Sequence, residues 1–301
     1  MSASLRAPVG HHGGVEQVRW AQVGEVRLAY QELGRREHPT VLLVMGQGTQ
    51  MLAWPDDVCT ALAARGLHVV RFDNRDTGGS THLPGRRLLA YTLDDLAADA
   101  VGLLDALGLP AAHLVGTSMG AMVAQLVATT WPRRVLSLTC IASSTGSRRV
   151  GRPRASLLLR LPVRRRARDR VEAGEVFARV VQAIGSPAYP VEPDRLRDLG
   201  ARCFDRGHHP RGSLRQLLAV VRAPDRTAAL GGVRVPTLVL HGDADPLVAV
   251  SGGRAVAAAV PGARLVTVPG MGHDLPPALW SLVVDEIHRI VMRGETRRAA
   301  T

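Results

Sequence analysis

The stretch GTSMG, residues 116–120, places Ser118 two positions from a glycine on each side. A serine hydroxyl becomes an effective nucleophile when a neighbouring base removes its proton, so the surroundings of Ser118 decide its role. An apolar run precedes the stretch, and a run of small, helix-forming residues follows it. In such a G-x-S-x-G turn a strand leads into a helix and the hydroxyl projects above the strand end. The sequence therefore predicts that Ser118 attacks an acyl carbonyl.

The base for this serine is expected in GMGHDLP, residues 270–276, which contains His273. This segment follows the last expected strand, and the carboxyl ends of parallel strands meet at one edge of a sheet. We therefore expect His273 beside Ser118, where its imidazole would take the serine proton. A loop histidine without a catalytic role is the alternative interpretation.

Two carboxylates that would orient the histidine lie in HGDADPLV, residues 241–248, after another expected strand. We favour Asp245, which lies deeper in the loop, just before Pro246. Asp243 directly follows Gly242 and is suited to capping the turn, and it remains the alternative acid. The resulting chain order of serine, acid and histidine is typical of a nucleophile on a strand–turn–helix elbow.

Two backbone N–H groups are expected to stabilise the oxyanion that forms during acyl transfer. One belongs to Met119, at the start of the helix that follows Ser118. The other is expected from Gln47, in VMGQGTQ after an apolar strand. Gly46 and Gly48, on either side of Gln47, would let the backbone approach the substrate. The alternative for this stretch is a glycine-rich turn without a ligand.

The elements that must position these residues alternate between apolar, strand-like runs and amphipathic helices. Strands are expected at 25–33, 40–46, 67–73, 111–117, 134–143, 235–245 (with its following loop) and 263–270, and helices at 54–66, 92–108, 121–131, 251–262 and 276–294. Such alternation predicts an α/β fold with a mostly parallel, twisted sheet and helices on both faces.

The alternation stops between about residues 145 and 232, where several amphipathic helices are expected and no convincing strand. The clearest helix is 171–185, and the interruption holds 19 of the 38 arginines. The predicted organisation is a flexible tail at 1–15, a core formed by 16–145 and 233–301, and an inserted helical cap at 146–232.

The composition is that of a globular protein, with 46% hydrophobic and 21% charged residues and a net charge of +12. All 38 basic residues are arginine, and aromatic residues make up only 3%, so a nucleic-acid partner is not expected. No apolar run reaches the length needed to span a bilayer, and no signal-peptide pattern opens the chain. We expect a cytoplasmic protein with a small-molecule substrate; its oligomeric state is not predicted.

Three other features favour structural roles. The cysteines Cys59, Cys140 and Cys203 lie far apart and indicate neither a disulfide framework nor a zinc site. CFDRGHHP, residues 203–210, is expected on the cap surface, because a metal site needs three or four convergent ligands. RRRARDR, residues 164–170, is expected as a solvated helix face, with attraction of an anionic substrate or surface as the alternative.

Four segments together resemble the α/β-hydrolase superfamily, and within it the subgroup of aclacinomycin methylesterases and related actinobacterial carboxylesterases. They are VMGQGTQMLAWPDDVCTALAARGLHVVRFDNRDTGGST, GTSMGAMVAQ, VPTLVLHGDADPLV and PGMGHDLP. Many superfamily members carry His-Gly at the oxyanion loop, whereas this chain has Met45-Gly46, as that subgroup does. FDNRDTGGS also belongs to the resemblance, and its charges at Asp73, Arg75 and Asp76 are expected to brace the loop by internal ion pairs.

The resemblance implies a Ser118–Asp245–His273 triad, an oxyanion hole formed by the Gln47 and Met119 N–H groups, and a helical cap. The expected reaction is hydrolysis of a carboxylic ester through an acyl-enzyme, without a metal or organic cofactor. A methyl ester of a polyketide-like or other small apolar molecule is the substrate that the subgroup implies. The alternatives are perhydrolysis, lactone opening, C–C bond hydrolysis or acyl transfer by the same triad, and a non-catalytic, ligand-binding member of the fold.

Overall fold

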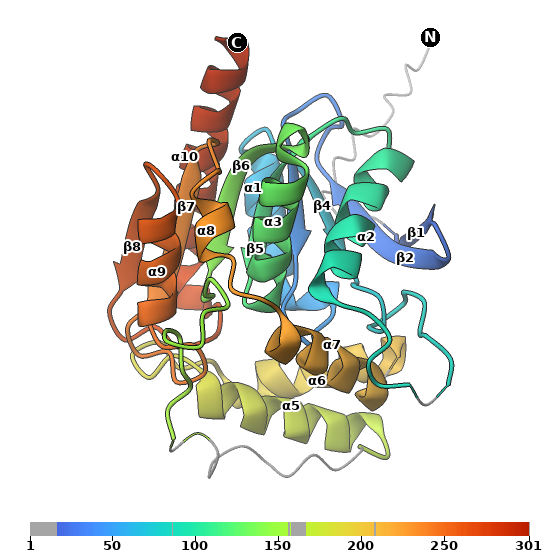
Figure 1. The fold of residues 1–301 in the computed structure, drawn as a ribbon. Helices are drawn as coiled ribbons and strands as arrows, with labels where there is room; N and C mark the ends of the chain where they lie inside the picture. Colours follow the sequence, from blue (N-terminus) through green and yellow to red (C-terminus); the bar gives the residue numbers. More distant parts are fainter. Residues whose placement is uncertain (1–16, 86, 156, 158–166, 208, 301) are drawn as a thin grey trace, which may run out of the picture.

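A computed structural model describes residues 17–85, 87–155, 157, 167–207 and 209–300 of the chain (Figure 1). Its strands form one sheet in the order β1-β2-β4-β3-β5-β6-β7-β8. The strands are β1 (Arg19–Val23), β2 (Val26–Leu33), β3 (Thr40–Val44), β4 (His68–Phe72), β5 (Ala112–Thr117), β6 (Val135–Ile141), β7 (Thr237–Gly242) and β8 (Arg264–Val268). All neighbours from β4 to β8 pair in parallel, while β1–β2 and β2–β4 are antiparallel.

Helices cover both faces of this sheet, as the sequence predicts. They are α1 (Asp56–Ala64), α2 (Leu93–Ala106), α3 (Met119–Thr130), α9 (Ser251–Ala259) and α10 (Trp280–Ala299). Figure 1 shows α2, α3 and α9 on the near face and α1 and α10 behind the sheet. Thr92 begins α2 with a capping box, in which the Thr92 N–H donates to Asp95 Oδ2 at 2.8 Å.

The two sides of each central strand pack into two separate apolar clusters. In β3, Leu42 and Val44 face the cluster under α2, α3 and α9, whereas Val41 and Leu43 face the one under α1 and α10. Successive strand residues point to opposite faces, so a strand buried on both sides needs an unbroken apolar run. The run 41–44 is fully buried and fixes the strand that leads to the expected oxyanion loop.

Among the residues that the structure describes, four helices lie between β6 and β7. They are α5 (Arg170–Ile184), α6 (Pro193–Arg206), α7 (Pro210–Arg222) and α8 (Thr227–Leu230). Helices α5, α6 and α7, hereafter the inserted helices, lie beyond one end of the sheet strands, while α8 packs against α3 and α9 (Figure 1). The arrangement accommodates the expected insertion, whose boundaries at 146 and 232 remain a prediction.

The structure differs from the expected elements mainly at their ends. Strand β1, which forms a hairpin with β2, is not among the strands expected from the sequence. Helix α3 begins at Met119 and not at 121, and α10 extends to Ala299, beyond 294. The expected tail, 1–15, lies outside the described residues. No helix in the part of the chain that the structure describes is long and apolar enough to cross a membrane.

Candidate active site

Ser118 occupies a strained turn between β5 and α3. Its φ is +53°, in the left-handed region that residues with a side chain rarely adopt. Gly116 and Gly120 make the turn possible, because a Cβ on Gly116 would lie 2.3 Å from the Gly120 carbonyl oxygen. A Cβ on Gly120 would lie 2.1 Å from the Val44 carbonyl oxygen. Both glycines therefore allow β3, β5 and α3 to approach closely beneath the serine.

The backbone of Ser118 is held from the neighbouring strand. Its N–H donates to the Ile141 carbonyl at 2.9 Å, and its own carbonyl accepts a hydrogen bond from Ser143 Oγ at 2.8 Å. Both partners lie at or just beyond the end of β6. These bonds stabilise the unfavourable backbone conformation of Ser118. They thereby fix the position from which its half-buried side chain projects.

The structure brings Ser118, His273 and Asp245 into one hydrogen-bonded relay. His273 Nε2 lies 3.0 Å from Ser118 Oγ, and His273 Nδ1 lies 2.7 Å from Asp245 Oδ2. Because a carboxylate accepts, Nδ1 carries the proton and Nε2 is left as the acceptor for the serine hydroxyl. This tautomer is the one that general-base catalysis by the histidine requires.

Asp245 is buried yet well supplied with hydrogen-bond donors. Its Oδ1 accepts from the N–H groups of Leu247 and Val248, each at 2.8 Å. His241 Nε2 lies 3.5 Å from Oδ2 and donates to the Val248 carbonyl at 2.8 Å. Burial by itself would raise the pKa of Asp245, but His273, His241 and the Val248 N–H together lower it well below its ordinary value. The carboxylate is therefore ionised at neutral pH.

Asp243, the alternative acid, lies at a different position in the loop. Its Oδ1 accepts from the Gly270 N–H at 2.7 Å, which ties the loop after β7 to the loop after β8. This contact is consistent with the turn-capping role expected of Asp243. Of the two aspartates, the structure therefore places Asp245, and not Asp243, in hydrogen-bond contact with His273.

The loop that carries His273 is bonded to the segment that follows α5. The His273 N–H donates to the Ile184 carbonyl at 2.8 Å, and the Gly272 N–H donates to Ser186 Oγ at 2.8 Å. Ser186 Oγ also donates to Asp274 Oδ1 at 2.5 Å. Burial raises the pKa of Asp274, although its hydrogen bonds with Ser186 and the nearby His273 act in the opposite direction.

The expected oxyanion loop lies against Ser118 on one side and against α7 on the other. A Cβ on Gly46 would lie 3.3 Å from Ser118 Cβ, so Gly46 permits close contact with the nucleophile loop. The Gly48 N–H donates to Gln216 Oε1 at 2.7 Å. By contrast, the N–H groups of Gln47 and Met119 make no hydrogen bond to any described residue. They are therefore available to an acyl oxygen.

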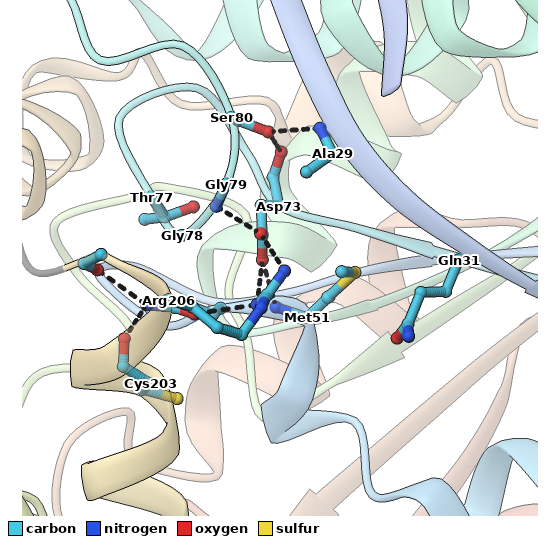
Figure 2. A network of polar contacts seen from close by, with 12 residues as sticks. Ala29, Gln31, Met51, Asp73, Thr77, Gly78, Gly79, Ser80, Cys203 and Arg206 are labelled. Carbon is cyan, nitrogen blue, oxygen red and sulfur yellow. Dashed lines mark hydrogen bonds and ion pairs between the residues drawn. The ribbon is translucent and has the colours of Figure 1, made fainter. Parts of the chain in front are cut away.

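The charged run after β4 does not form internal ion pairs, and the expectation that it would is wrong. Each charge pairs with a more distant residue. These pairs are Asp73 with Arg206 at 2.8 Å, Arg75 with Asp99 at 2.6 Å and Asp76 with Arg215 at 3.2 Å. Because Arg206 ends α6 and Arg215 lies in α7, two of the pairs attach the inserted helices to the sheet layer. Figure 2 shows the first of them, between Asp73 and Arg206.

The described residues of two other segments, 203–210 and 164–170, contact neighbouring side chains. His209 stacks on His82, with 3.2 Å between ring centroids, while His208 and residues 164–166 of the arginine run lie outside the described residues. Arg168, exposed, pairs with Glu172. No group of three or more His, Cys, Asp or Glu side chains within the described ranges is arranged to hold a metal ion.

The three cysteines are free thiols. Burial raises the pKa of Cys59 to about 11 and the pKa values of Cys140 and Cys203 to about 12 each. Thiols in such surroundings are protonated at neutral pH and are poor nucleophiles. They therefore do not compete with Ser118 as the reactive side chain.

Sequence reasoning gave no role to His241, Ser186 or Gln216, although all three contact the candidate site. His241 lies in β7, four positions before Asp245. Its position close to the candidate acid is a local signal from which a contact between the two could have been predicted. Ser186 and Gln216 carried no signal, because their contacts join segments far apart in the chain.

Comparisons with known proteins show the family of the chain. A family model described as serine aminopeptidase, S33, matches residues 36–276. The chain is 32% identical over 282 residues to rhodomycin D methylesterase DauP of Streptomyces sp. (strain C5), which covers 85% of this chain and 91% of that protein. It is 31% identical over 288 residues to rhodomycin D methylesterase DnrP of Streptomyces peucetius, with the same coverage of both chains.

Solved structures resemble most of the chain. An enol-lactonase from Burkholderia xenovorans LB400 matches with a TM-score of 0.73 at 23% identity, over 91% of this chain and 100% of that one. A hydrolase from Pseudomonas aeruginosa PA01 matches with a TM-score of 0.66 at 30% identity, over 89% and 97% of the two chains. At its lower identity, the likeness to the enol-lactonase is evidence for the fold alone.

Proposed function

Because the chain belongs to the serine aminopeptidase S33 family within the α/β-hydrolase superfamily, we propose that Ser118, His273 and Asp245 form its catalytic triad. The protein is a hydrolase that acts on esters. The observation that carries the proposal is the relay from Ser118 Oγ to His273 at 3.0 Å and from His273 to Asp245 at 2.7 Å. No metal or organic cofactor has a part in the proposed mechanism.

In the first half-reaction, Ser118 Oγ attacks the ester carbonyl carbon while His273 Nε2 takes the hydroxyl proton. Asp245 holds the imidazole tautomer and stabilises the imidazolium that forms. The proton then passes from His273 to the leaving alkoxide, which departs as an alcohol. Ser118 is left as an acyl-enzyme.

In the second half-reaction, His273 removes a proton from water, and the resulting hydroxide attacks the acyl carbon. The Ser118 oxygen leaves and regains its proton from His273, which releases the carboxylic acid. In both steps the N–H groups of Gln47 and Met119 would stabilise the carbonyl oxygen when it becomes an oxyanion. Loss of one such donor typically costs about 3–4 kcal/mol of transition-state stabilisation.

We infer a small, apolar ester as the substrate, and a methyl ester of a polyketide-like molecule as its candidate form. The methylesterase names of the DauP and DnrP relatives support this inference. Perhydrolysis, lactone opening, C–C bond hydrolysis and acyl transfer would use the same triad. Analysis of the products from a panel of methyl esters, lactones and vinylogous diketones separates these reactions.

The triad is tested by labelling with a fluorophosphonate probe and by turnover of short p-nitrophenyl esters. The wild-type protein should be labelled and active, whereas Ser118→Ala should be unlabelled and inactive. Ser281→Ala, at an exposed position of α10, is the matched control and should behave as wild type. Absence of labelling in folded wild-type protein would refute the mechanism and favour a non-catalytic, ligand-binding role.

A further inference from the structure

The expected oxyanion loop is flexible by composition, because Gln47 lies between two glycines. Gly48 has a φ of +70°, and a Cβ there would lie 2.4 Å from Ser213 Oγ. A loop of this kind has little stiffness of its own, yet an oxyanion donor must be oriented before the reaction to be effective. Contacts from elsewhere in the protein must therefore fix the Gln47 N–H.

These contacts come from α7. Gln47 Nε2 donates to the Ser213 carbonyl at 2.6 Å and to Ser213 Oγ at 2.8 Å. The next N–H, that of Gly48, donates to Gln216 Oε1 at 2.7 Å. The side chain of Gln47 and the peptide that follows it are thus both held, which restricts rotation of the Gln47 backbone on either side.

Gln216 is itself fixed in place. It is completely buried, and its Nε2 donates to the Arg75 carbonyl at 2.8 Å. A side-chain amide with one partner for its oxygen and one for its nitrogen has a defined orientation. Gln216 therefore presents its oxygen to Gly48 with little freedom to turn away.

We propose that Ser213 and Gln216 of α7 are positioning residues, which hold the Gln47 N–H toward the oxyanion of the reaction. The proposal rests on the proposed function, because it presumes that Ser118 forms a tetrahedral adduct beside Gln47. Helix α7 would thus contribute to catalysis by holding the expected oxyanion loop. The donor is in place only while α7 is docked on the loop.

The test compares Gln47→Met and Gln216→Met with wild type. Gln47→Met keeps the backbone N–H but removes the side-chain bonds to Ser213, while Gln216→Met removes the acceptor for the Gly48 N–H. We expect kcat for a short p-nitrophenyl ester to fall about tenfold to a hundredfold in each variant, because small misplacements of catalytic groups are that costly. KM should stay within about twofold of wild type.

A trifluoromethyl alkyl ketone distinguishes positioning from a general structural role. Ser118 Oγ adds to its carbonyl carbon, the hydroxyl proton passes to His273, and the ketone oxygen becomes an oxyanion in the proposed hole. Inhibition should weaken in each variant by about the same factor as kcat/KM falls. Val221→Ala, at an exposed position of the same helix, is the control and should change neither quantity.

The proposal is overturned if folded Gln47→Met keeps wild-type kcat and inhibition, or if KM alone rises. Gln47→Met decides alone if Gln216→Met does not fold, since the Gln47 side chain is only half-buried. Labelling of wild-type Ser118 by fluorophosphonate keeps the two proposals separable. Without that labelling the triad itself fails, whereas labelled wild type with an unaffected Gln47→Met rejects only the role of α7.

Discussion

Ser186 Oγ lies 2.5 Å from Asp274 Oδ1 and thereby joins the segment after α5 to the residue that follows His273. The same oxygen accepts the Gly272 N–H at 2.8 Å, so one hydroxyl bridges two positions of the base loop. Because Ser186 is buried, bulk water has little access to replace these bonds. The position of the proposed base therefore depends on the insertion as well as on β8.

Replacing Ser186 with alanine should loosen the base loop. Ser186→Ala leaves the Gly272 N–H and the Asp274 carboxylate without this partner, which should lower the free energy of unfolding by about 1–3 kcal/mol. We also expect kcat for p-nitrophenyl esters to fall, because His273 is less well held. Thermal unfolding and steady-state kinetics measure the two effects, with Ser281→Ala as the exposed control. Unchanged kcat and stability would show that the bridge is dispensable.

The two aspartates of the loop after β7 should differ strongly in their effect on catalysis. Asp245→Asn keeps the shape of the side chain but favours the wrong histidine tautomer, and we expect kcat to fall by about 10⁴. Asp243→Asn loses a carboxylate that accepts from the Gly270 N–H, and it should affect stability more than kcat. Steady-state kinetics of the two variants make the comparison, and a larger loss in Asp243→Asn would reverse the assignment.

The order of these site residues along the chain was predictable, but their bracing was not. Ser118, Asp245 and His273 each follow an apolar strand, and parallel strands bring such positions to one sheet edge. The bonds from Ser186 and Gln216 depend on how the inserted helices pack, and no local pattern encodes that packing. Hairpin strand β1 was missed for a related reason, since its partly exposed residues show little apolar periodicity.

The charged run after β4 shows the same limit. Its charges at Asp73, Arg75 and Asp76 lie close together in sequence, which made internal pairing the simplest expectation. In the structure they diverge from the loop, and each meets a partner at least 24 positions away. Proximity in sequence decides such pairings only when the side chains share a face, as in a helix.

Asp245 should also make stability depend on pH. Its pKa is lowered in the folded protein, so the ionised carboxylate favours the folded state at any pH above its unfolded value of about 3.9. This contribution is lost as the pH falls from there through the folded pKa. The difference in Tm between wild type and Asp245→Asn should therefore be larger at neutral pH than at about pH 3. A difference that does not change over this range would contradict the assigned environment of Asp245.

Asp73 and Arg206 carry the last prediction, because their largely buried ion pair links α6 to the loop after β4. Asp73 is fully buried, and it also accepts from the Met51 N–H at 2.7 Å and from the Gly79 N–H at 2.9 Å (Figure 2). Arg206 Nη1 donates in addition to Gln50 Oε1 at 2.8 Å. The pair thus secures the end of the expected oxyanion loop that lies away from Gln47.

Removing only the cation should be costly. Arg206→Met leaves Asp73 buried without its counter-charge, and we expect the free energy of unfolding to fall by about 3–5 kcal/mol. The double variant Asp73→Asn with Arg206→Met should recover part of that loss, because no uncompensated charge remains. Denaturant unfolding of both variants measures these changes.

A matched surface pair shows whether burial is the cause. Arg170 of α5 and Asp205 of α6 lie 3.2 Å apart, but their side chains are about half exposed. Solvent screens such a pair, so Arg170→Met should cost no more than about 1 kcal/mol. If Arg206→Met costs no more than Arg170→Met, the Asp73–Arg206 pair does not anchor α6, and the docking of the inserted helices must rest on their other contacts with the sheet layer.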